Sequence, residues 1–182
     1  MLVVLIAGGL ISLPFALPFL PVESYIRYAK FLGMEPQSEE RDQPGKLSQH
    51  YADMFGWKEM ADTVAAVYQR LSPEEKSRCG IFAENYGEAA AIDFFGRKYG
   101  LPPAISGHNS YWMWGPGKTT GEVMIIVGGE LEDHQPFYEE CRQEAIIQNE
   151  YARSFETDLP VFVCRNLKLP VAEAWPQTKG FI

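Results

Sequence analysis

The sequence predicts an α/β fold, in which a three-layer, Rossmann-like, open and mostly parallel sheet follows one N-terminal transmembrane helix. Three observations support this prediction: a charge-free run at residues 1–21, short apolar runs that alternate with amphipathic segments, and the apolar character of those runs on both faces. We therefore expect a transmembrane helix at 1–22, a linker at 23–49 and a soluble α/β domain at 50–182.

The charge-free run, MLVVLIAGGLISLPFALPFLP, would be about 30 Å long as a helix, which is enough to cross the hydrocarbon core of a bilayer. A signal peptide is the main rival, but no Lys or Arg precedes the apolar residues. Pro14 and Pro18 would break a soluble helix and are tolerated in membrane helices. A buried hydrophobic hairpin is the remaining alternative. Because the run begins at residue 1 with no flank, we expect the chain to be a fragment of a longer protein.

Three helix starts follow. Apolar residues recur at three- and four-residue spacing over 57–71, which predicts an amphipathic helix. Ser72-Pro73-Glu74-Glu75 has the signature of a capped helix start. Asn85-x-x-Glu88 resembles a capping box and predicts a helix that stops near Tyr99-Gly100.

The predicted strands are short and apolar. They lie at 80–83, 104–106, 122–127 and 161–164, and the polar segment at 131–142 is predicted to be helical. Strands that alternate with helices in this way are typical of a parallel sheet.

Composition excludes several classes of partner and site. With 24 acidic and 16 basic residues the chain has a net charge of −8 and no basic stripe, so we expect no nucleic-acid partner. Cys79, Cys141 and Cys164 form no CxxC or Cys/His cluster, so no metal site is expected. Buried thiols are the favoured interpretation, and one disulfide is the alternative for a domain outside the cytoplasm.

Ligands of open α/β sheets bind beyond the carboxyl ends of the strands. Three segments are predicted to meet there: Glu84-Asn85-Tyr86, the loop around His108, and Gly128-Gly129-Glu130. This edge is the candidate site.

Carboxylates, an amide and flat rings at this edge favour a ligand that is rich in hydroxyl groups, such as a sugar. No GxGxxG or GxxxxGK[ST] motif is present, and Glu84 and Glu88 would repel a phosphate, so no nucleotide and no cofactor are expected. The candidate substrate-binding residues are Glu84, Asn85, Tyr86, Glu88, His108, Asn109, Tyr111, Trp112 and Trp114.

Each candidate has a structural alternative. Asn85 and Glu88 would serve only as a helix cap. In an extended loop Trp112 and Trp114 would point the same way, and they would then hold a ligand, pack on the sheet or face lipid headgroups. His108 alone is more often a hydrogen-bonded structural residue.

A hydrolase is the enzyme alternative. Its triad would draw on Ser106 or Ser110, His108 or His134, and Asp93 or Asp133. No GxSxG elbow is present, and Ser106 lacks the strand–Ser–helix setting that exposes a nucleophile. A glycosidase pair of Glu84 and Glu88 is unsupported because Glu84 precedes the cap. A hydrolytic triad is therefore not expected.

HYADMFGWKEM (50–60), IFAENYGEAAAIDFFGRKYGLPPAISGHNSYWMWGPG (81–117) and LPVFVCRNLKLPVAEAWPQ (159–177) resemble the C-terminal soluble domain of bacterial family 39 membrane glycosyltransferases. These enzymes are related to the dolichyl-phosphate-mannose–protein mannosyltransferases and to the aminoarabinose transferases of lipid A. NYGEA and SGHNSYWxWGP are the most specific part of the resemblance, which covers nearly the whole chain.

The resemblance implies a multi-spanning enzyme that moves a sugar from a polyprenyl-phosphate donor to a sugar or lipid acceptor outside the cytoplasm. Its acidic catalytic residue would lie in a missing N-terminal portion. This chain would then be an accessory domain that covers the active site or helps to select the acceptor. The alternative is a stand-alone, membrane-anchored module that binds carbohydrate or a lipid headgroup.

The resemblance also implies the cell membrane as the location, with the α/β domain on the extracytoplasmic side. Arg27 and Lys30 follow the apolar run and point to the cytoplasmic side by the positive-inside rule. We give the resemblance more weight than these two charges.

Overall fold

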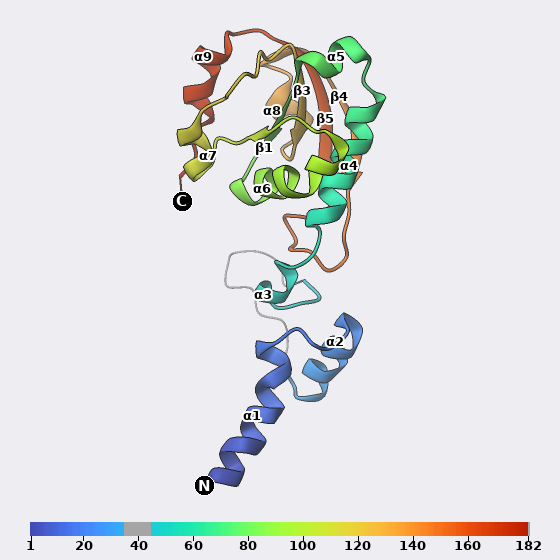
Figure 1. Cartoon of the computed structure of the whole chain (residues 1–182), viewed down its shortest axis with the longest axis vertical. Helices are drawn as coiled ribbons and strands as arrows, with labels where there is room; N and C mark the ends of the chain where they lie inside the picture. The colour runs from blue at the N-terminus through green and yellow to red at the C-terminus, as the bar shows by residue number, and fades with distance from the viewer. Residues whose placement is uncertain (35–44, 182) are drawn as a thin grey trace. The chain divides into compact units, whose positions relative to one another are not determined.

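The computed structural model describes residues 1–34 and 45–181. Its contacts divide the chain into two compact units: Met1–Phe55 with Glu150–Ser154, and Gly56–Asn149 with Phe155–Ile182. Residues 35–44 of the predicted linker at 23–49 lie outside the described residues. Figure 1 traces the elements of both units.

The first unit contains the helices α1 (Leu2–Ala16), α2 (Val22–Phe31) and α3 (Gln49–Ala52). The predicted transmembrane helix is wrong: none of the helices in the described part of the chain is long and apolar enough to cross a membrane. Pro14 is accommodated inside α1, but the chain becomes extended at Leu17. A residue that precedes a proline is disfavoured in helical conformation, so Pro18 stops the helix early. Helix α2 begins at Val22, where the expected transmembrane helix ends, and continues into the expected linker at 23–49.

The C-terminal end of α1 belongs to a small core of the first unit. This core is formed by Tyr25, Leu47, Tyr51 and Ala52, with Phe15 and Leu20 packed against it. The Tyr51 hydroxyl donates to the carbonyl of Pro14, and the Tyr28 hydroxyl donates to that of Ile11 at 2.7 Å. Aromatic side chains therefore satisfy carbonyls of α1, whereas the apolar side chains from Leu2 to Ile6 are exposed.

The second unit is built on a five-stranded mixed sheet in the order β2-β1-β3-β5-β4. The strands are β1 (Cys79–Ala83), β2 (Ala104–Ile105), β3 (Val123–Val127), β4 (Tyr138–Ile147) and β5 (Leu159–Leu167). β1 pairs in parallel with β2 and β3, whereas β5 is antiparallel to both β3 and β4. The α/β class is as expected, but the expected Rossmann-like, mostly parallel sheet is wrong.

Strand β4 is the reason for this difference. The segment predicted to be helical at 131–142 forms only the short helix α8 (Leu131–His134) and then enters β4. β4 is the edge strand of the sheet and carries many polar side chains. Its sequence therefore lacks the alternation of apolar and polar residues from which a strand is predicted. The short connection at 148–158 then returns the chain to β5. A connection of this length, without a crossover helix, joins antiparallel strands.

Cysteine side chains link these two strands. Cys141 and Cys164 face each other in the β4–β5 register and form a disulfide. Cys79 is a buried free thiol whose pKa is raised to about 12 by burial. The expectation of buried thiols is confirmed for Cys79, and the alternative of one disulfide holds for the other two. Disulfides persist in oxidising compartments.

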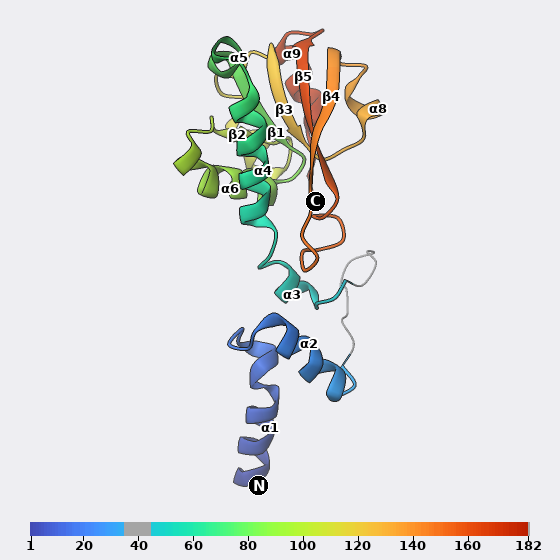
Figure 2. The ribbon, with the colours of Figure 1, turned by 90° about the vertical axis from the view of Figure 1, so that its right-hand side faces the viewer.

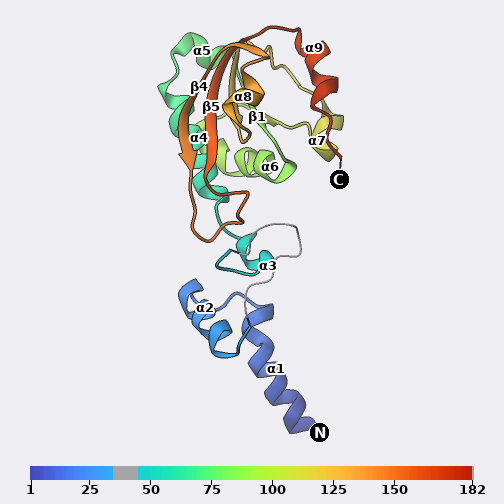
Figure 3. The ribbon, with the colours of Figure 1, turned by 180° about the vertical axis from the view of Figure 1, so that it is seen from behind.

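Helices cover the two faces of the sheet unequally. The longer helices α4 (Trp57–Arg70) and α6 (Tyr86–Phe95) lie on one side, and α8 and α9 (Val171–Ala174) lie on the other (Figures 2 and 3). Alternation along the strands separates the two cores. The first contains Met60, Val64, Ile81, Ile92, Ile125 and Val163, and the second contains Met124, Ile126, Phe162 and Cys164.

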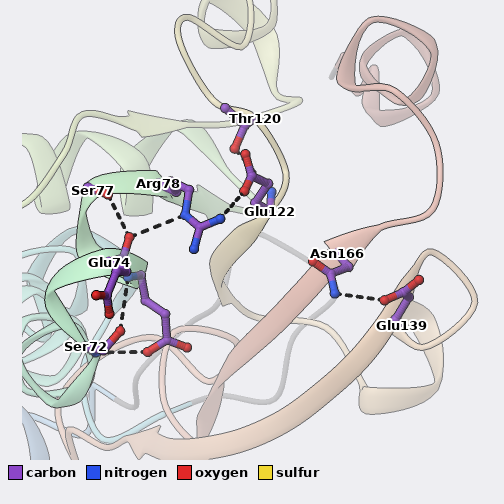
Figure 4. A network of polar contacts seen from close by, with 9 residues as sticks. Ser72, Glu74, Ser77, Arg78, Thr120, Glu122, Glu139 and Asn166 are labelled. Carbon is purple, nitrogen blue, oxygen red and sulfur yellow. Dashed lines mark hydrogen bonds and ion pairs between the residues drawn. The ribbon is translucent and has the colours of Figure 1, made fainter.

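The predicted helix starts are confirmed. Both Ser72 and Asn85 form complete capping boxes, at α5 (Pro73–Arg78) and α6. At the strand starts of β1 and β3, Arg78 donates to the Glu74 carbonyl at 3.5 Å and to the Glu122 carboxylate at 2.6 Å (Figure 4). This polar network anchors α5 at the amino ends of β1 and β3. The candidate site lies at the other, carboxyl ends of these strands.

Candidate functional site

The carboxyl ends of the parallel strands β1, β2 and β3 bring the three predicted segments together. The Ser106 hydroxyl, after β2, donates to the carbonyl of Glu84, after β1, at 3.3 Å. A Cβ atom at Gly128, after β3, would lie 3.0 Å from the Glu84 side chain. Parallel pairing of these strands therefore places the segments at one edge, as the sequence predicts.

A cavity of about 370 Å³ opens at this edge. Of the predicted residues, it is lined by Glu84, Asn85, Glu88 and His108. The remaining lining residues are Gly107, Phe155, Leu159, Thr178, Gly180 and Phe181. We call this space the Glu88 cavity. Sequence reasoning missed Phe155 and Phe181 because neither follows a parallel strand, and the sequence around them carries no recognisable motif.

The C-terminal segment, residues 175–181, closes one side of the cavity through backbone hydrogen bonds. The Gly180 N–H donates to the Gly107 carbonyl at 2.8 Å, and the Asn109 N–H donates to the Gly180 carbonyl at 2.9 Å. His108 and Gly180 form a parallel bridge. The chain end is thus paired with the loop that follows β2, which fixes Phe181 at the cavity wall.

Glu88 is the buried acidic group of the cavity. Its side chain is 2% exposed, and its carboxylate accepts a hydrogen bond from the Asn85 N–H at 3.2 Å. Burial, together with the nearby charges of Glu84 and Glu156, raises its pKa to about 7, although the hydrogen bond from Asn85 acts to lower it. Burial also raises the pKa of Glu84, while His134 lowers it. Near neutral pH, Glu88 can therefore both donate and accept hydrogen bonds.

Replacing Glu88 by glutamine should flatten the pH dependence of stability between about pH 4.5 and 7. The folded-state pKa exceeds the ordinary value of 4.5, so in this range the folded chain binds more protons than the unfolded chain. The free energy of unfolding then falls as the pH rises, by on the order of 3 kcal/mol in total. Glutamine stays neutral and can still accept from Asn85.

Urea unfolding of both proteins from pH 4 to 8 measures this effect. Wild type should lose stability with rising pH, and Glu88→Gln should be the more stable protein above pH 7. Glu132→Gln, at an exposed position on α8, is the matched control and should follow wild type. Parallel curves for Glu88→Gln and wild type would refute the burial of an ionisable carboxyl here.

His108 supplies a polar atom that lacks an internal partner. Its ring packs against Tyr86 with 5.0 Å between centroids. The Nε2 atom is buried and has no hydrogen-bond partner within residues 1–34 and 45–181. Buried polar atoms normally find a partner, so this nitrogen is available to a ligand group.

The aromatic segment differs from its prediction. Asn109–Trp114 forms the helix α7, so the expected extended loop with Trp112 and Trp114 on one side is wrong. Residues two apart on a helix face nearly opposite directions. The Trp112 indole N–H donates to the Trp175 carbonyl at 3.3 Å, and the Trp175 indole returns the same bond to Trp112. This reciprocal pair docks α7 on the C-terminal segment.

The other aromatic candidates lie outside the Glu88 cavity. The Tyr111 hydroxyl donates to Asp93 at 2.8 Å, and its ring packs on the main core. Trp114 is 71% exposed and contacts the Tyr111 ring. Tyr86 contacts His108 without lining the cavity, and Asn109 contributes its backbone N–H to Gly180. Tyr111 and Trp112 therefore have packing contacts, whereas the Trp114 side chain is largely exposed.

A hydrolytic triad is not assembled. The Ser106 hydroxyl is buried, donates to the Glu84 carbonyl and accepts from the His108 backbone N–H at 3.2 Å. Asp93 accepts from Tyr111 and from the Ala104 N–H, and His134 bonds to the Gly128 carbonyl. No metal-binding group of three or more His, Cys, Asp or Glu side chains occurs in the described part of the chain.

Comparisons of the chain with protein-family models, with curated proteins and with solved structures find no match. Functional assignment therefore depends on the geometry of the Glu88 cavity. That geometry offers two carboxyl groups, an amide and an unpaired imidazole nitrogen beside two phenylalanine rings.

Proposed function

We propose that the chain is a carbohydrate-binding accessory domain of a polyprenyl-phosphate-sugar-dependent membrane glycosyltransferase. In this proposal the Glu88 cavity holds a sugar ring of the donor or the acceptor, and catalysis belongs to another part of the enzyme. The observation that carries the proposal is the clustering of Glu84, Asn85, Glu88 and His108 around one cavity.

The polar groups of the cavity suit hydroxyls. A hydroxyl both donates and accepts, and a carboxyl group with a pKa of about 7, such as that of Glu88, does the same near neutral pH. The unpaired Nε2 atom of His108 adds a third position for a hydroxyl. Phe155 and Phe181 supply flat apolar surface for the C–H face of a sugar ring.

Charge restricts which part of a sugar phosphate fits. Glu84 and Glu88 both line the cavity, and no Lys or Arg of residues 1–34 and 45–181 lines it. An anion would meet like charges in a poorly solvated place, which is costly. The cavity therefore suits the neutral ring of the ligand, and the phosphate would remain outside.

Two further features support the membrane setting of the proposal. Apolar side chains on α1, among them Leu2, Leu5 and Leu10, are exposed, and the helix contains no charged residue. A helix that is apolar on all sides suits an apolar surrounding. The Cys141–Cys164 disulfide favours an oxidising location, as on the extracytoplasmic side.

NMR titration of the whole chain in detergent with mannose, glucose and galactose tests the cavity. We expect saturable shifts of the backbone amides of Gly107, His108 and Gly180 with at least one sugar, and none with inorganic phosphate. Glu84→Gln should weaken binding by about tenfold, because a hydrogen bond to a charged group is lost. Glu132→Gln is the control. Unshifted signals with all three sugars would refute carbohydrate binding.

The transferase assignment has its own test. The reading frame upstream of Met1 should encode membrane spans and a loop with acidic residues. A stop codon immediately before Met1 would instead favour the stand-alone binding module, without affecting the sugar titration.

A further inference from the structure

We infer that the chain has a second binding site, a mostly apolar cavity on the other face of the sheet that takes one uncharged ring with a single polar substituent. This cavity has a volume of about 210 Å³. Its floor is formed by Phe82, Ile105, Met124 and Ile126, and its cover includes Ala174 and Trp175. We call it the Trp175 cavity. The inference is independent of carbohydrate binding.

The cavity arises because this face of the sheet is poorly covered. The opposite face packs against α4, with 14 residues, and α6, with 10. On this face α8, α9 and η2 (Trp175–Thr178) have four residues each. Figure 3 shows α8 and α9 on this side of the strands. Helices of one turn cannot fill the space above apolar strand residues, so a cavity remains.

Most polar groups around the Trp175 cavity are already paired. The Asp133 carboxylate accepts from the Glu130 N–H at 3.0 Å, and His134 Nε2 lies 3.0 Å from the Gly128 carbonyl oxygen. The Thr178 hydroxyl donates to the Trp175 carbonyl at 2.8 Å. The described lining residues include no Lys or Arg, and the one carboxylate among them, that of Asp133, is held by a backbone N–H.

Tyr138 is the exception. It lines the cavity, and its hydroxyl forms no hydrogen bond within residues 1–34 and 45–181. Burial raises its pKa to about 12, so the hydroxyl stays protonated and neutral. It can therefore donate one hydrogen bond to a ligand oxygen, which gives the site one directional contact beside its apolar surface.

Size and polarity together define the ligand class. An apolar cavity of about 150 Å³ admits benzene, so a cavity of about 210 Å³ admits one ring with a small substituent. A charged ligand would lose its hydration without a countercharge, which disfavours anions such as carboxylates. Phenol-like or cyclohexanol-like molecules fit both conditions.

The two cavities are separable in experiments. Thr178 is the lining residue that they share, and the other lining residues of each are different. A substitution in α9 therefore changes the Trp175 cavity and leaves the carboxyl groups of the Glu88 cavity in place.

Fluorine NMR of 4-fluorophenol with the whole chain in detergent tests the inference. We expect saturable broadening of the probe signal that an excess of phenol reverses, and no such effect for 4-fluorobenzoate. Ala174→Phe fills the cavity and should abolish saturable binding. Ala172→Phe places the same side chain at an exposed position of the same helix and should bind as wild type. The probe partitions into detergent equally for all variants, so a difference between variants reports binding to the protein.

Tyr138→Phe provides a second test that preserves the cavity wall. Loss of one hydrogen bond should weaken 4-fluorophenol binding by about tenfold and leave fluorobenzene binding unchanged. The inference is overturned if Ala174→Phe and Ala172→Phe bind the probe equally, if Tyr138→Phe binds it as wild type does, or if wild type shows no saturable binding.

Discussion

Gly107→Ala should detach the C-terminal segment from the sheet edge and abolish binding in both cavities. A Cβ atom at this position would lie 1.9 Å from the carbonyl oxygen of Thr178 and 2.8 Å from its carbonyl carbon. Both are backbone atoms, so no side-chain rotation can relieve the overlap. Either the loop that follows β2 or the C-terminal segment must move.

Movement here breaks a connected set of contacts. The two hydrogen bonds between Gly180 and the loop would be lost, and with them the fixed position of Phe181. Trp175, which pairs with Trp112 and covers the second cavity, belongs to the same segment. Two backbone hydrogen bonds contribute about 2 kcal/mol, and overpacking typically costs a further 1–3 kcal/mol. We expect a destabilisation of about 3 to 5 kcal/mol.

Hydrogen exchange at the Asn109 and Gly180 amides measures detachment directly. Both amides should exchange rapidly in Gly107→Ala, while amides of β3 and β5 remain protected. Gly45→Ala is the control, because its Cβ atom would meet nothing closer than 4.0 Å. Slow exchange at Gly180 in the variant would show that the segment is not held by this contact.

Local signals in the sequence located much of the Glu88 cavity. The capping box of Asn85 and Glu88 and the apolar strands β1 and β3 depend on neighbours in the chain, so pattern reasoning finds them. Because the carboxyl ends of parallel strands lie at one edge of the sheet, the same reasoning places the loop with His108 beside Glu84. Phe155 and Phe181 reach the cavity through contacts that are distant in sequence, and no local pattern records such contacts.

The predictions of an extended loop at 109–114 and of a helix at 131–142 are wrong because contacts distant in sequence decide the conformation of both segments. α7 is a helix of one to two turns that is too short to be stable alone. Its bonds to Trp175 and Asp93 hold it, and those partners are far away in the sequence. β4 is a polar edge strand whose partner, β5, follows it. In both cases tertiary contacts, and not local preference, decide the conformation.

Removal of the Cys141–Cys164 disulfide, which joins the edge strand β4 to β5, should lower the free energy of unfolding by about 3 kcal/mol. The bridge closes a loop with a sequence separation of 23 residues. A cross-link over such a loop restricts the unfolded chain by roughly this amount. Among the described strands β4 pairs with β5 alone, and its register has an irregularity between Gln143 and Ala145. It therefore depends on the bridge more than a central strand would.

Urea unfolding of wild type and of the double variant Cys141→Ala/Cys164→Ala, each with and without dithiothreitol, separates the bridge from its side chains. The reductant should lower the midpoint of wild type to near that of the variant and leave the variant unchanged. Thiol titration of denatured wild type should find one free cysteine, Cys79. If three thiols react, or if dithiothreitol leaves the wild-type midpoint unchanged, the strands pair without the bridge. The structural argument for an oxidising compartment would then be removed.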